Sequence, residues 1–287
     1  MEKVSVITPT HNGLATLPET IASVQAQTYA SIEHIIVDDG SDDEAFLQYL
    51  SSLPEEIQVM HQANAGPAAA RNHGIDAASG TYILLLDDDD LIDPTYIEKA
   101  VQILDRVEAD IVYCQADRFG EVECPWDLPP FSPVTMLVDN VVFITALFPK
   151  ALWSRAGGFD EGMKKGLEDY DFWLTQLEHD ARFYRIPEVL FHCRVKPQSH
   201  NVESANTEQK LLDNYSYLYQ KHHALFLRYE EEYMAALRAD WIHLRYILNK
   251  PVEPPPPPPP PKGLRGHAGA LLRRIINGKG VKNHGEA

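Results

Sequence analysis

Short apolar runs alternate with amphipathic segments through the first 113 residues of the chain. The runs are four or five residues long and rich in branched side chains, which is typical of buried strands. The segments between them carry apolar residues at helical spacing and open with residues that favour helix starts. The pattern predicts strands at 4–8, 34–37, 57–60, 82–86 and 110–113, and helices at 18–27, through 46–50, through 68–72 and at 94–107.

Strands that alternate with helices predict an α/β fold, in which a mostly parallel sheet has helices on both faces. In open sheets of this kind, ligands bind beyond the carboxyl ends of the strands. The turns at 9–13, 38–43 and 87–90 follow strands and are rich in oxygen and amide groups. We expect these three turns to lie along one edge of the sheet and to form a ligand site there.

After residue 113 the pattern becomes less regular. Residues 120–133 are rich in proline and predict irregular structure, whereas the apolar run at 141–147 is a further strand candidate. Apolar residues at helical spacing between 167 and 177 predict a helix whose first turn holds Glu168 and Asp169. The helix dipole favours carboxylates at that position, so a purely structural role for this pair is the alternative.

The C-terminal part of the chain changes in composition. Residues 203–250 predict an aromatic-rich helical region, and the linker at 251–262 contains eight consecutive prolines. These prolines predict a stiff polyproline II spacer of about 25 Å. In the tail at 263–287, leucine and isoleucine alternate with arginine. The tail is either a basic amphipathic helix that contacts an anionic membrane surface or a solvated, partly disordered segment.

The charge balance and the spacing of the cysteines argue against several classes of protein. The chain has 287 residues and a net charge of −17, which argues against a protein that binds the phosphate backbone of nucleic acids. From Lys262 onward there are six Lys or Arg and one Asp or Glu, so the tail carries +5 and the remainder −22. The three cysteines show no CxxC spacing, which indicates neither a zinc site nor a disulfide framework.

The same features predict where the protein acts. Unpaired cysteines fit a reducing cytosol. The N-terminus lacks the apolar stretch of a signal peptide, and no apolar window approaches the length of a membrane-spanning helix. We therefore expect a cytoplasmic protein, with peripheral contact at the inner face of the membrane if the tail binds lipid.

Four consecutive aspartates, Asp87 to Asp90, follow the strand at 82–86. Carboxylates this close together raise the electrostatic free energy unless a positive charge lies beside them. A divalent cation held by hard oxygen ligands, particularly one that also binds phosphates, would supply that charge. The alternative is an acidic surface turn in which Asp93 caps a helix that begins at Pro94. That alternative explains Asp93 and Pro94 but leaves the four aspartates unexplained.

Five motifs, in this order, resemble those of family 2 glycosyltransferases over roughly residues 2–200. They are Val4-Ser5-Val6-Ile7-Thr8-Pro9-Thr10-His11-Asn12, then Ile36-Val37-Asp38-Asp39-Gly40-Ser41, then Asn64-Ala65-Gly66 with Ala70-Arg71-Asn72-His73-Gly74, then Leu86-Asp87-Asp88-Asp89-Asp90, and last Gly157-Gly158-Phe159-Asp160 with Glu168-Asp169. The resemblance implies a GT-A, Rossmann-like domain at 1–202, with a nucleotide-binding half at 1–113 and an acceptor half at 114–202. The helical region at 203–250 would then be a C-terminal extension.

The family implies an inverting hexosyltransferase-like enzyme that moves a sugar from a nucleotide-sugar, usually a UDP-sugar, to a hydroxyl group. The acceptor would be a glycan, a lipid-linked molecule or another hydroxyl compound. By resemblance, the residues expected at the nucleotide are Thr8, Pro9, Thr10, Asn12, Asp38, Asp39, Asn64, Gly66, Arg71, Asp87 and Asp88. Among them, Asp39, with Asp38 beside it, is expected to read the base, and Asp87 to face the ribose.

The metal and the catalytic base are also implied by the resemblance. Asp87 and Asp89 match the family's Asp-x-Asp pair, and Asp89 is the expected ligand of Mn²⁺ or Mg²⁺, although Asp88 or Asp90 could take a role. Such a cation neutralises the leaving diphosphate. Asp169 matches the base that takes the proton of the acceptor hydroxyl, and Glu168 would bind or orient the acceptor.

The sequence departs from the family pattern at two places. Thr175 and Gln176 stand where an arginine often follows the Glu-Asp pair, which leaves the charge around the acceptor open. The segment 191–196 resembles an aromatic-Arg-x-His motif with lysine in the place of histidine. His192 is a candidate metal ligand, with a structural role as the alternative, and Arg194 and Lys196 are candidates to bind the diphosphate.

Other classes of protein fit the sequence less well. A sugar-1-phosphate nucleotidyltransferase would carry a Gly-rich, Arg-containing loop after the first strand, which 9–13 is not. A dinucleotide-dependent oxidoreductase would carry GxGxxG there. A phosphatase with an aspartate nucleophile would carry Gly-Thr after its Asp-x-Asp pair, near the N-terminus. A non-catalytic nucleotide-sugar-binding module would lose the base, whereas Asp169 is present.

Overall fold

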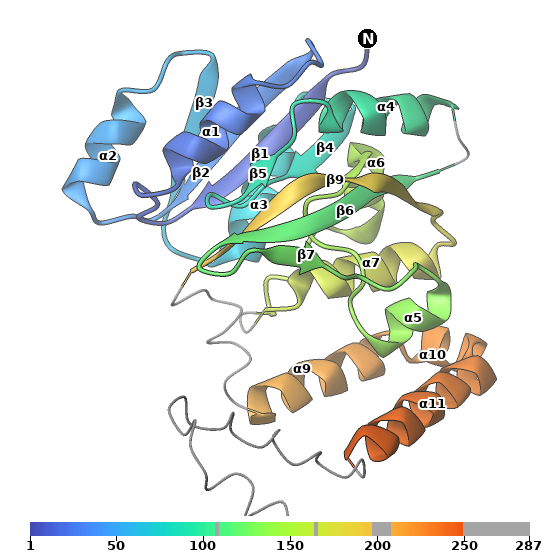
Figure 1. Cartoon of the computed structure of the whole chain (residues 1–287). Helices are drawn as coiled ribbons and strands as arrows, with labels where there is room; N and C mark the ends of the chain where they lie inside the picture. The colour runs from blue at the N-terminus through green and yellow to red at the C-terminus, as the bar shows by residue number, and fades with distance from the viewer. Residues whose placement is uncertain (107–108, 164–165, 197–207, 249–287) are drawn as a thin grey trace, which may run out of the picture. The chain divides into compact units, whose positions relative to one another are not determined.

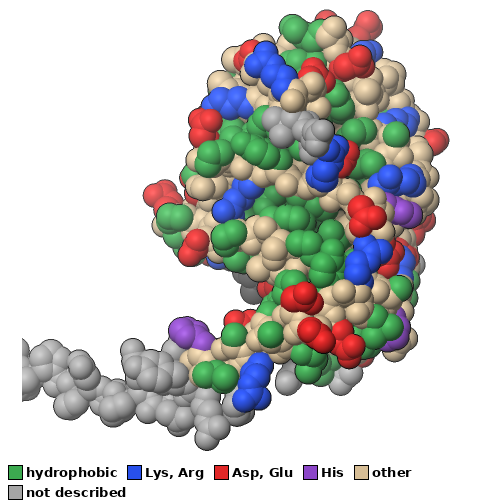
Figure 2. All heavy atoms as spheres, turned by 90° about the vertical axis from the view of Figure 1, so that its right-hand side faces the viewer, with side chains coloured by type: hydrophobic (Ala, Val, Ile, Leu, Met, Phe, Trp, Pro, Cys, Tyr) green, Lys and Arg blue, Asp and Glu red, His purple; other side chains and the backbone are tan. Residues whose placement is uncertain are grey.

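The computed structural model describes residues 1–106, 109–163, 166–196 and 208–248. The predicted linker at 251–262 and tail at 263–287 lie outside the described residues. The sheet belongs to the compact unit Met1–Trp241. None of the helices in the described ranges is long and apolar enough to cross a membrane. Figure 2 shows one face of the molecule, on which acidic side chains are interspersed with basic and apolar ones.

The strands of the described chain form one sheet, in the order β3-β2-β1-β4-β8-β6-β9-β5, with β7 paired to β6. Their bounds are β1 Val4–Thr10, β2 Ile32–Asp39, β3 Ile57–Gln62, β4 Tyr82–Leu85, β5 Leu91–Ile92, β6 Ile111–Gly120, β7 Cys124–Trp126, β8 Leu147–Pro149 and β9 Phe183–Val195. The four strands β3, β2, β1 and β4 are parallel, as are β6 and β9, whereas β8, β7 and β5 pair antiparallel. The predicted mixed, mostly parallel α/β sheet is confirmed.

Helices cover both faces of this sheet, and the last of them gather at one end beside α5 and α7 (Figure 1). The bounds are α1 Leu17–Gln25, α2 Glu44–Ser51, α3 Pro67–Ala77, α4 Tyr96–Arg106, α5 Pro133–Val138, α6 Lys150–Ala156, α7 Glu168–Glu178, α9 Glu208–Lys221, α10 His223–Arg228 and α11 Glu230–Leu248. The predicted helices at 18–27, through 46–50, through 68–72, at 94–107 and at 167–177 therefore all form, and residues 208–248 of the predicted helical extension are helical.

Successive side chains of β2 point to opposite faces of the sheet, which therefore separates two apolar layers. Ile36 packs with Leu17 and Phe46 of α1 and α2 in a cluster of its own. The next residue, Val37, belongs to the larger core on the other side, where Ile7 and helix α3 also lie. Successive residues of a strand point to opposite faces, so one short apolar run supplies both layers.

The prediction of a strand at 141–147 is wrong except at its last residue. Residues 141–146 are buried without forming a strand, and β8 begins only at Leu147. The run is apolar because Phe143 packs among rings, with centroids 5.9 Å from Tyr113, 6.0 Å from Trp126 and 4.5 Å from Phe191. A short apolar run indicates that the segment is buried, but it does not distinguish a strand from an irregular core segment.

The long pair β6 and β9 extends beyond the predicted strand at 110–113. The two strands stay in register from Ile111 to Cys114, where Cys114 is opposite Ile186. The following residue, Gln115, pairs with Val189, so the register of the two strands shifts around Pro187. Proline cannot donate a hydrogen bond to a sheet, and it is tolerated where a bulge interrupts the ladder. This irregularity hides the strand from a search for simple alternation.

Gly74 in α3 permits the helix to approach the sheet closely. A Cβ atom at this position would lie 2.5 Å from Cγ2 of Ile7 and 2.9 Å from Cγ2 of Val37. We expect Gly74→Ala to destabilise the fold by about 1–3 kcal/mol, because overpacking outweighs the gain in helix propensity. The free energy of unfolding in urea measures this effect. Asp76→Ala, on the exposed side of the same helix, should change it by less than about 0.5 kcal/mol; equal stability of both variants with the native protein would contradict the close approach.

Candidate active site

The structure brings the three polar turns together at one edge of the sheet. Thr10, the last residue of β1, is opposite Asp38 near the end of β2. The hydroxyl of Thr10 donates a hydrogen bond to Oδ2 of Asp88 at 2.5 Å, which joins the first turn to the acidic cluster. The parallel pairing of β1 with both β2 and β4 causes this meeting, because parallel strands end on the same side.

Asn12 ties the first turn to the second. Its backbone has a positive φ of 55°, a conformation that asparagine tolerates better than most residues. The side-chain amide donates to Oδ1 of Asp42 at 2.7 Å, and its oxygen accepts from the backbone N–H groups of Asp42 and Asp43, each at 3.1 Å. Thr8 points elsewhere: its buried hydroxyl lies 2.9 Å from Nε2 of His34. The side chains of Thr8 and Asn12 are therefore engaged within the protein.

Asp38 and Asp39 are buried and accept hydrogen bonds from neighbouring loops. Oδ1 of Asp39 accepts from Ala65 N at 2.8 Å, and Oδ2 accepts from Gly66 N at 2.9 Å. Burial raises the pKa of Asp38, but hydrogen bonds from Ser41 and His61 outweigh it and hold that pKa below its ordinary value. Asp39 thus fixes the segment that leads into α3, where Gly66 has a φ of 95° just before Pro67, whereas Asp38 holds the turn at Ser41.

Arg71 joins residues 1–113 to residues 114–202 through two ion pairs. Its guanidinium is buried, with Nη2 at 2.7 Å from Oδ1 of Asp87 and Nη1 at 2.5 Å from Oε1 of Glu168. Burial lowers the pKa of Arg71, but the charges of Asp87 and Glu168 outweigh it and hold that pKa above its ordinary value. One cation thus connects α3, the end of β4 and the start of α7.

Asp169 occupies the first turn of α7, after Leu167 with its positive φ of 69°. Asn140 donates from Nδ2 to Oδ2 of Asp169 at 3.0 Å, and the N–H of Tyr170 donates to Oδ1 at 2.8 Å. Burial, and next the charge of Glu168, raise the pKa of Asp169 to about 7. The residue as a whole is half-buried, and its carboxylate is held between the side chain of Asn140 and the N–H of Tyr170.

The four aspartates of the acidic cluster have different partners. Asp87 pairs with Arg71, and Asp89 lies 2.9 Å from Nζ of Lys196. Burial, with the charges of Asp89 and Asp87, raises the pKa of Asp88 to about 6. Asp90 is buried and accepts from the backbone N–H of Arg194 at 2.8 Å.

The C-terminal end of β9 lies against this cluster. Nε of Arg194 donates to the carbonyl oxygen of Asp89 at 2.8 Å, and its guanidinium also pairs with Glu19. His192 is engaged differently, because its Nδ1 lies 2.7 Å from Oδ1 of Asp117. This partner favours the structural role for His192. Across the described ranges, no three His, Cys, Asp or Glu side chains converge on one point.

The cluster nevertheless fits a divalent cation of the magnesium type. Such ions take one or two carboxylates together with oxygens of a bound phosphate group, and need no complete cage of protein ligands. The raised pKa of Asp88 arises from burial and from the carboxylates of Asp87 and Asp89. A cation bound beside these carboxylates would relieve that excess negative charge.

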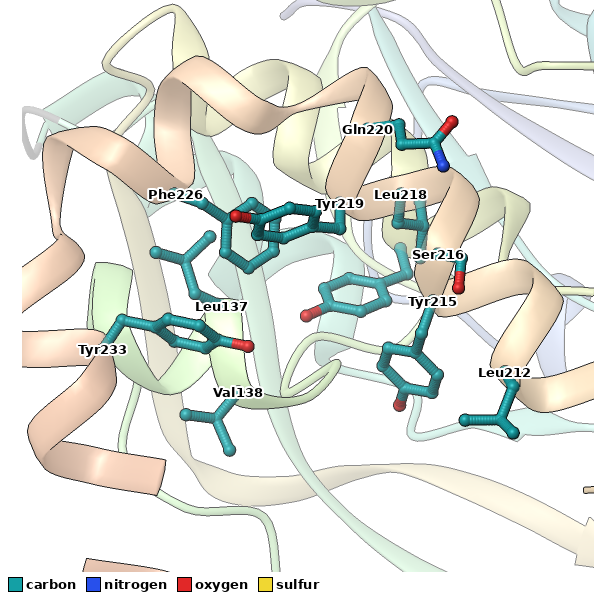
Figure 3. Close-up of a pocket in the computed structure, with 11 residues that line it drawn as sticks. Leu137, Val138, Leu212, Tyr215, Ser216, Leu218, Tyr219, Gln220, Phe226 and Tyr233 are labelled. Carbon is teal, nitrogen blue, oxygen red and sulfur yellow. The ribbon is translucent and has the colours of Figure 1, made fainter. Parts of the chain in front are cut away.

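Residues of α9, α10 and α11 line a cavity that the motifs did not indicate. The cavity has a volume of about 360 Å³ and lies between these helices, α5 and Tyr170. Figure 3 shows the residues that line it. They are Leu137, Val138, Tyr170, Leu212, Tyr215, Ser216, Leu218, Tyr219, Gln220, Phe226 and Tyr233. The cavity lies close to the Glu-Asp pair, because Tyr170 follows Asp169 and Asn140 follows α5 by two residues.

Asn140 is the contact of Asp169 that sequence reasoning missed. It lies in the irregular segment after α5, outside every motif, so no local signal marks it. The predicted residues themselves fall into two groups. Those of the turns gather at the strand ends, together with Asn64, whose Nδ2 lies 3.3 Å from Nδ1 of His11. Glu168 is joined to this edge by Arg71, and Asp169 is its neighbour in the chain.

Arg71 allows a direct test of the ion-pair bridge. We expect Arg71→Met to lower the free energy of unfolding by about 3–5 kcal/mol, because Asp87 and the buried Glu168 lose the cation that lies between them. Urea denaturation measures the loss. Lys99→Met is the matched control, since it breaks the more exposed pair with Glu188 and should cost at most about 1 kcal/mol. Equal losses in the two variants would show that the bridge is unimportant.

Comparisons with known proteins agree with this geometry. Residues 5–159 match the family model described as glycosyl transferase family 2. An uncharacterized glycosyltransferase of Rickettsia typhi is 31% identical over 236 residues, which is 75% of this chain and 70% of that protein. A similar protein of Haemophilus influenzae is 30% identical over 222 residues, covering 73% of this chain and 74% of the other.

Two further comparisons concern a longer relative and a solved structure. An uncharacterized protein of Sinorhizobium fredii is 34% identical over 207 residues, which is 68% of this chain but only 23% of that protein. The crystal structure of S. aureus TarS residues 1–349 in complex with UDP is 23% identical, with a TM-score of 0.58, and the match covers 70% of this chain and 63% of that one. The chain therefore belongs to glycosyl transferase family 2 and has the GT-A fold.

Proposed function

We propose that this glycosyltransferase moves a sugar from a nucleotide-sugar, a UDP-sugar, to the hydroxyl group of a glycan, lipid-linked or other acceptor with inversion. The bridge from Asp87 through Arg71 to Glu168, next to Asp169, is the observation that carries the proposal. It connects the carboxylates expected at the donor to the carboxylate expected at the acceptor. A crystal structure of TarS in complex with UDP-GlcNAc, 21% identical with a TM-score of 0.60, favours a donor of this class.

The donor would lie along the edge where β1, β2 and β4 end. Asp38 and Asp39 would face the base, Thr10 and Asn12 the nucleoside, and Asp87 the ribose. Asn64 and Gly66 precede α3, whose N-terminus favours negative charge. Several of these side chains are held by neighbouring loops, so much of this site is set before the donor binds. Pro9 and Thr8 would contribute through the backbone of β1, since the hydroxyl of Thr8 faces His34.

The leaving diphosphate would lie between the acidic cluster and the end of β9. Asp89 would hold Mn²⁺ or Mg²⁺, with Asp88 beside it, and the bound ion would supply the Lewis acidity that stabilises the departing diphosphate. Lys196, now 2.9 Å from Asp89, and Arg194 supply positive charge at the same place. A guanidinium and an ammonium group suit phosphate oxygens in charge and hydrogen bonding.

Asp169 would remove the proton from the acceptor hydroxyl as that oxygen attacks the anomeric carbon. A base near neutral pKa is most effective at physiological pH, and the pKa of Asp169 is raised to about 7 by burial and by Glu168. Glu168, held by Arg71, would orient the acceptor. A single displacement of this kind inverts the configuration and needs no covalent enzyme nucleophile.

Binding and hydrolysis assays test the proposal together. We expect UDP to bind the purified protein by calorimetry in the presence of Mn²⁺, and one of a panel of nucleotide-sugars to be slowly hydrolysed. Asp169→Asn should lower kcat about 10²–10⁴-fold, the usual contribution of a general base, and leave the Kd for UDP within about twofold. Absence of UDP binding with and without metal would overturn the donor class, and full activity of the variant would place the base elsewhere.

The pH dependence of hydrolysis tests the base by another route. The carboxylate form of Asp169 is the active form, so kcat/KM should fall as the pH drops through about 7, the raised pKa of this residue. An ordinary aspartate would titrate near pH 4. Because the charge of Glu168 contributes to the raised pKa, Glu168→Gln should move the midpoint to lower pH. A wild-type midpoint near 4 would contradict this role.

A further inference from the structure

Two adjacent residues at the junction of α9 and α10 contact α7. Nζ of Lys221 lies 2.8 Å from Oδ2 of Asp171 and 2.8 Å from Oδ2 of Asp160. Nε2 of His222 lies 3.0 Å from Oδ1 of the same Asp171. The side chains of His222 and Asp171 are 1% and 3% exposed. Both oxygens of a buried carboxylate in the first turn of α7 are therefore satisfied by the C-terminal extension.

His222 also reaches the far end of the same helix. Its Nδ1 lies 3.0 Å from Oε1 of Glu178, although the two groups lack the alignment of a hydrogen bond. Asp171 and Glu178 are seven residues apart and so lie on one face of the helix, two turns from each other. One imidazole in contact with both ends of that face restricts rotation and sliding of α7.

Lys221 connects α7 to a second family motif. Asp160 follows Phe159, whose backbone N–H donates to Oδ1 of Asn72 at 2.8 Å and whose carbonyl accepts from Nδ2 of Asn72 at 2.9 Å. Hydrogen bonds from Lys221, first, and from Tyr217 lower the pKa of Asp160 to about 2, so this carboxylate is charged. The ammonium group of Lys221 thus lies between the helix of the base and the segment packed beside Arg71.

We propose that Lys221 and His222 are positioning residues for sugar transfer, which hold the first turn of α7, and with it Asp169, in the geometry that the reaction needs. This inference rests on the proposed role of Asp169 as the base. Asp171 and Asp169 share one helical turn, so a rotation of α7 about its axis displaces both. Lys221 and His222 lie outside the family match at 5–159, as α7 does, so the match itself assigns them no role.

The expected fall in kcat follows from the strict geometry that proton transfer requires. A displacement of about 1 Å in a reacting group can lower a rate about a hundredfold. The bound nucleotide depends on the strand ends, whereas the ammonium group of Lys221 contacts Asp171 and Asp160. A change at Lys221 should therefore lower kcat while the affinity for UDP is kept.

Lys221→Met is the principal variant, with Lys221→Arg as the conservative one. We expect Lys221→Met to lower kcat for nucleotide-sugar hydrolysis about 10–100-fold, with the Kd for UDP within about twofold, and Lys221→Arg to recover most of the rate. Arg228→Met is the matched control, because it removes an exposed pair between α10 and Asp180 just beyond α7, and should leave kcat unchanged. Wild-type kcat in folded Lys221→Met would overturn the inference.

A second variant keeps the test valid if Lys221→Met does not fold. Tyr217→Phe removes the hydroxyl that donates to Asp160 at 2.6 Å from a side chain that is 44% exposed, and leaves every charge in place. It should lower kcat severalfold with unchanged UDP affinity, and an unaltered kcat would count against the inference. If Asp169→Asn kept full activity, the proposed function and this inference would both be wrong. Loss of activity in Asp169→Asn, with full activity in Lys221→Met and Tyr217→Phe, would overturn only the positioning role.

Discussion

The guanidinium of Arg71 is buried between Asp87 and Glu168, and the arrangement of the candidate active site depends on this contact. A buried cation is tolerated only when its charge and its donors are paired. The requirement is met by carboxylates from two distant parts of the chain, one at the end of β4 and one at the start of α7. The fold thus couples the position of α7 to the strand edge, because neither carboxylate can move away without leaving a buried charge incompletely paired.

The acidic cluster shows how one residue type takes different roles in neighbouring positions. Asp87 and Asp89 face cations, with Arg71 beside the first and Lys196 beside the second. Asp90 faces inward and accepts a hydrogen bond from the backbone of β9. Burial first, and then the charges of Asp89 and Asp87, raise the pKa of both Asp88 and Asp90. The four carboxylates therefore differ in the partners that compensate their charge.

Much of the fold was predictable because its signals are local. The strands up to residue 113 are short apolar runs between helices. Asp43 caps α2 by accepting from Phe46 N, a position that aspartate favours. The turns at the strand ends follow from the same alternation. The conformation of segment 141–147 and the full extent of the bulged pair β6 and β9 were not predicted. Burial without regular hydrogen bonding leaves no periodic pattern in the sequence. The candidate site divides in the same way: the motif residues are close together in sequence, whereas Asn140, Lys221 and His222 contact Asp169 or Asp171 from segments without a motif. Only the approach of these segments in space gives them a role.

The pairing of β5 with β9 has a consequence for the order in which the protein assembles. Leu91 and Ile92 complete the loop of the acidic cluster, and their partners are His192 and Phe191. The N–H of Arg194 that binds Asp90 is 104 residues further along the chain. Contacts between such distant segments close a large loop and form late in folding. During synthesis, the parallel strands β1 to β4 can therefore pair before β9, which contacts the acidic loop, has been synthesised. A nascent chain thus acquires the strand edge with its polar turns before the candidate active site is complete.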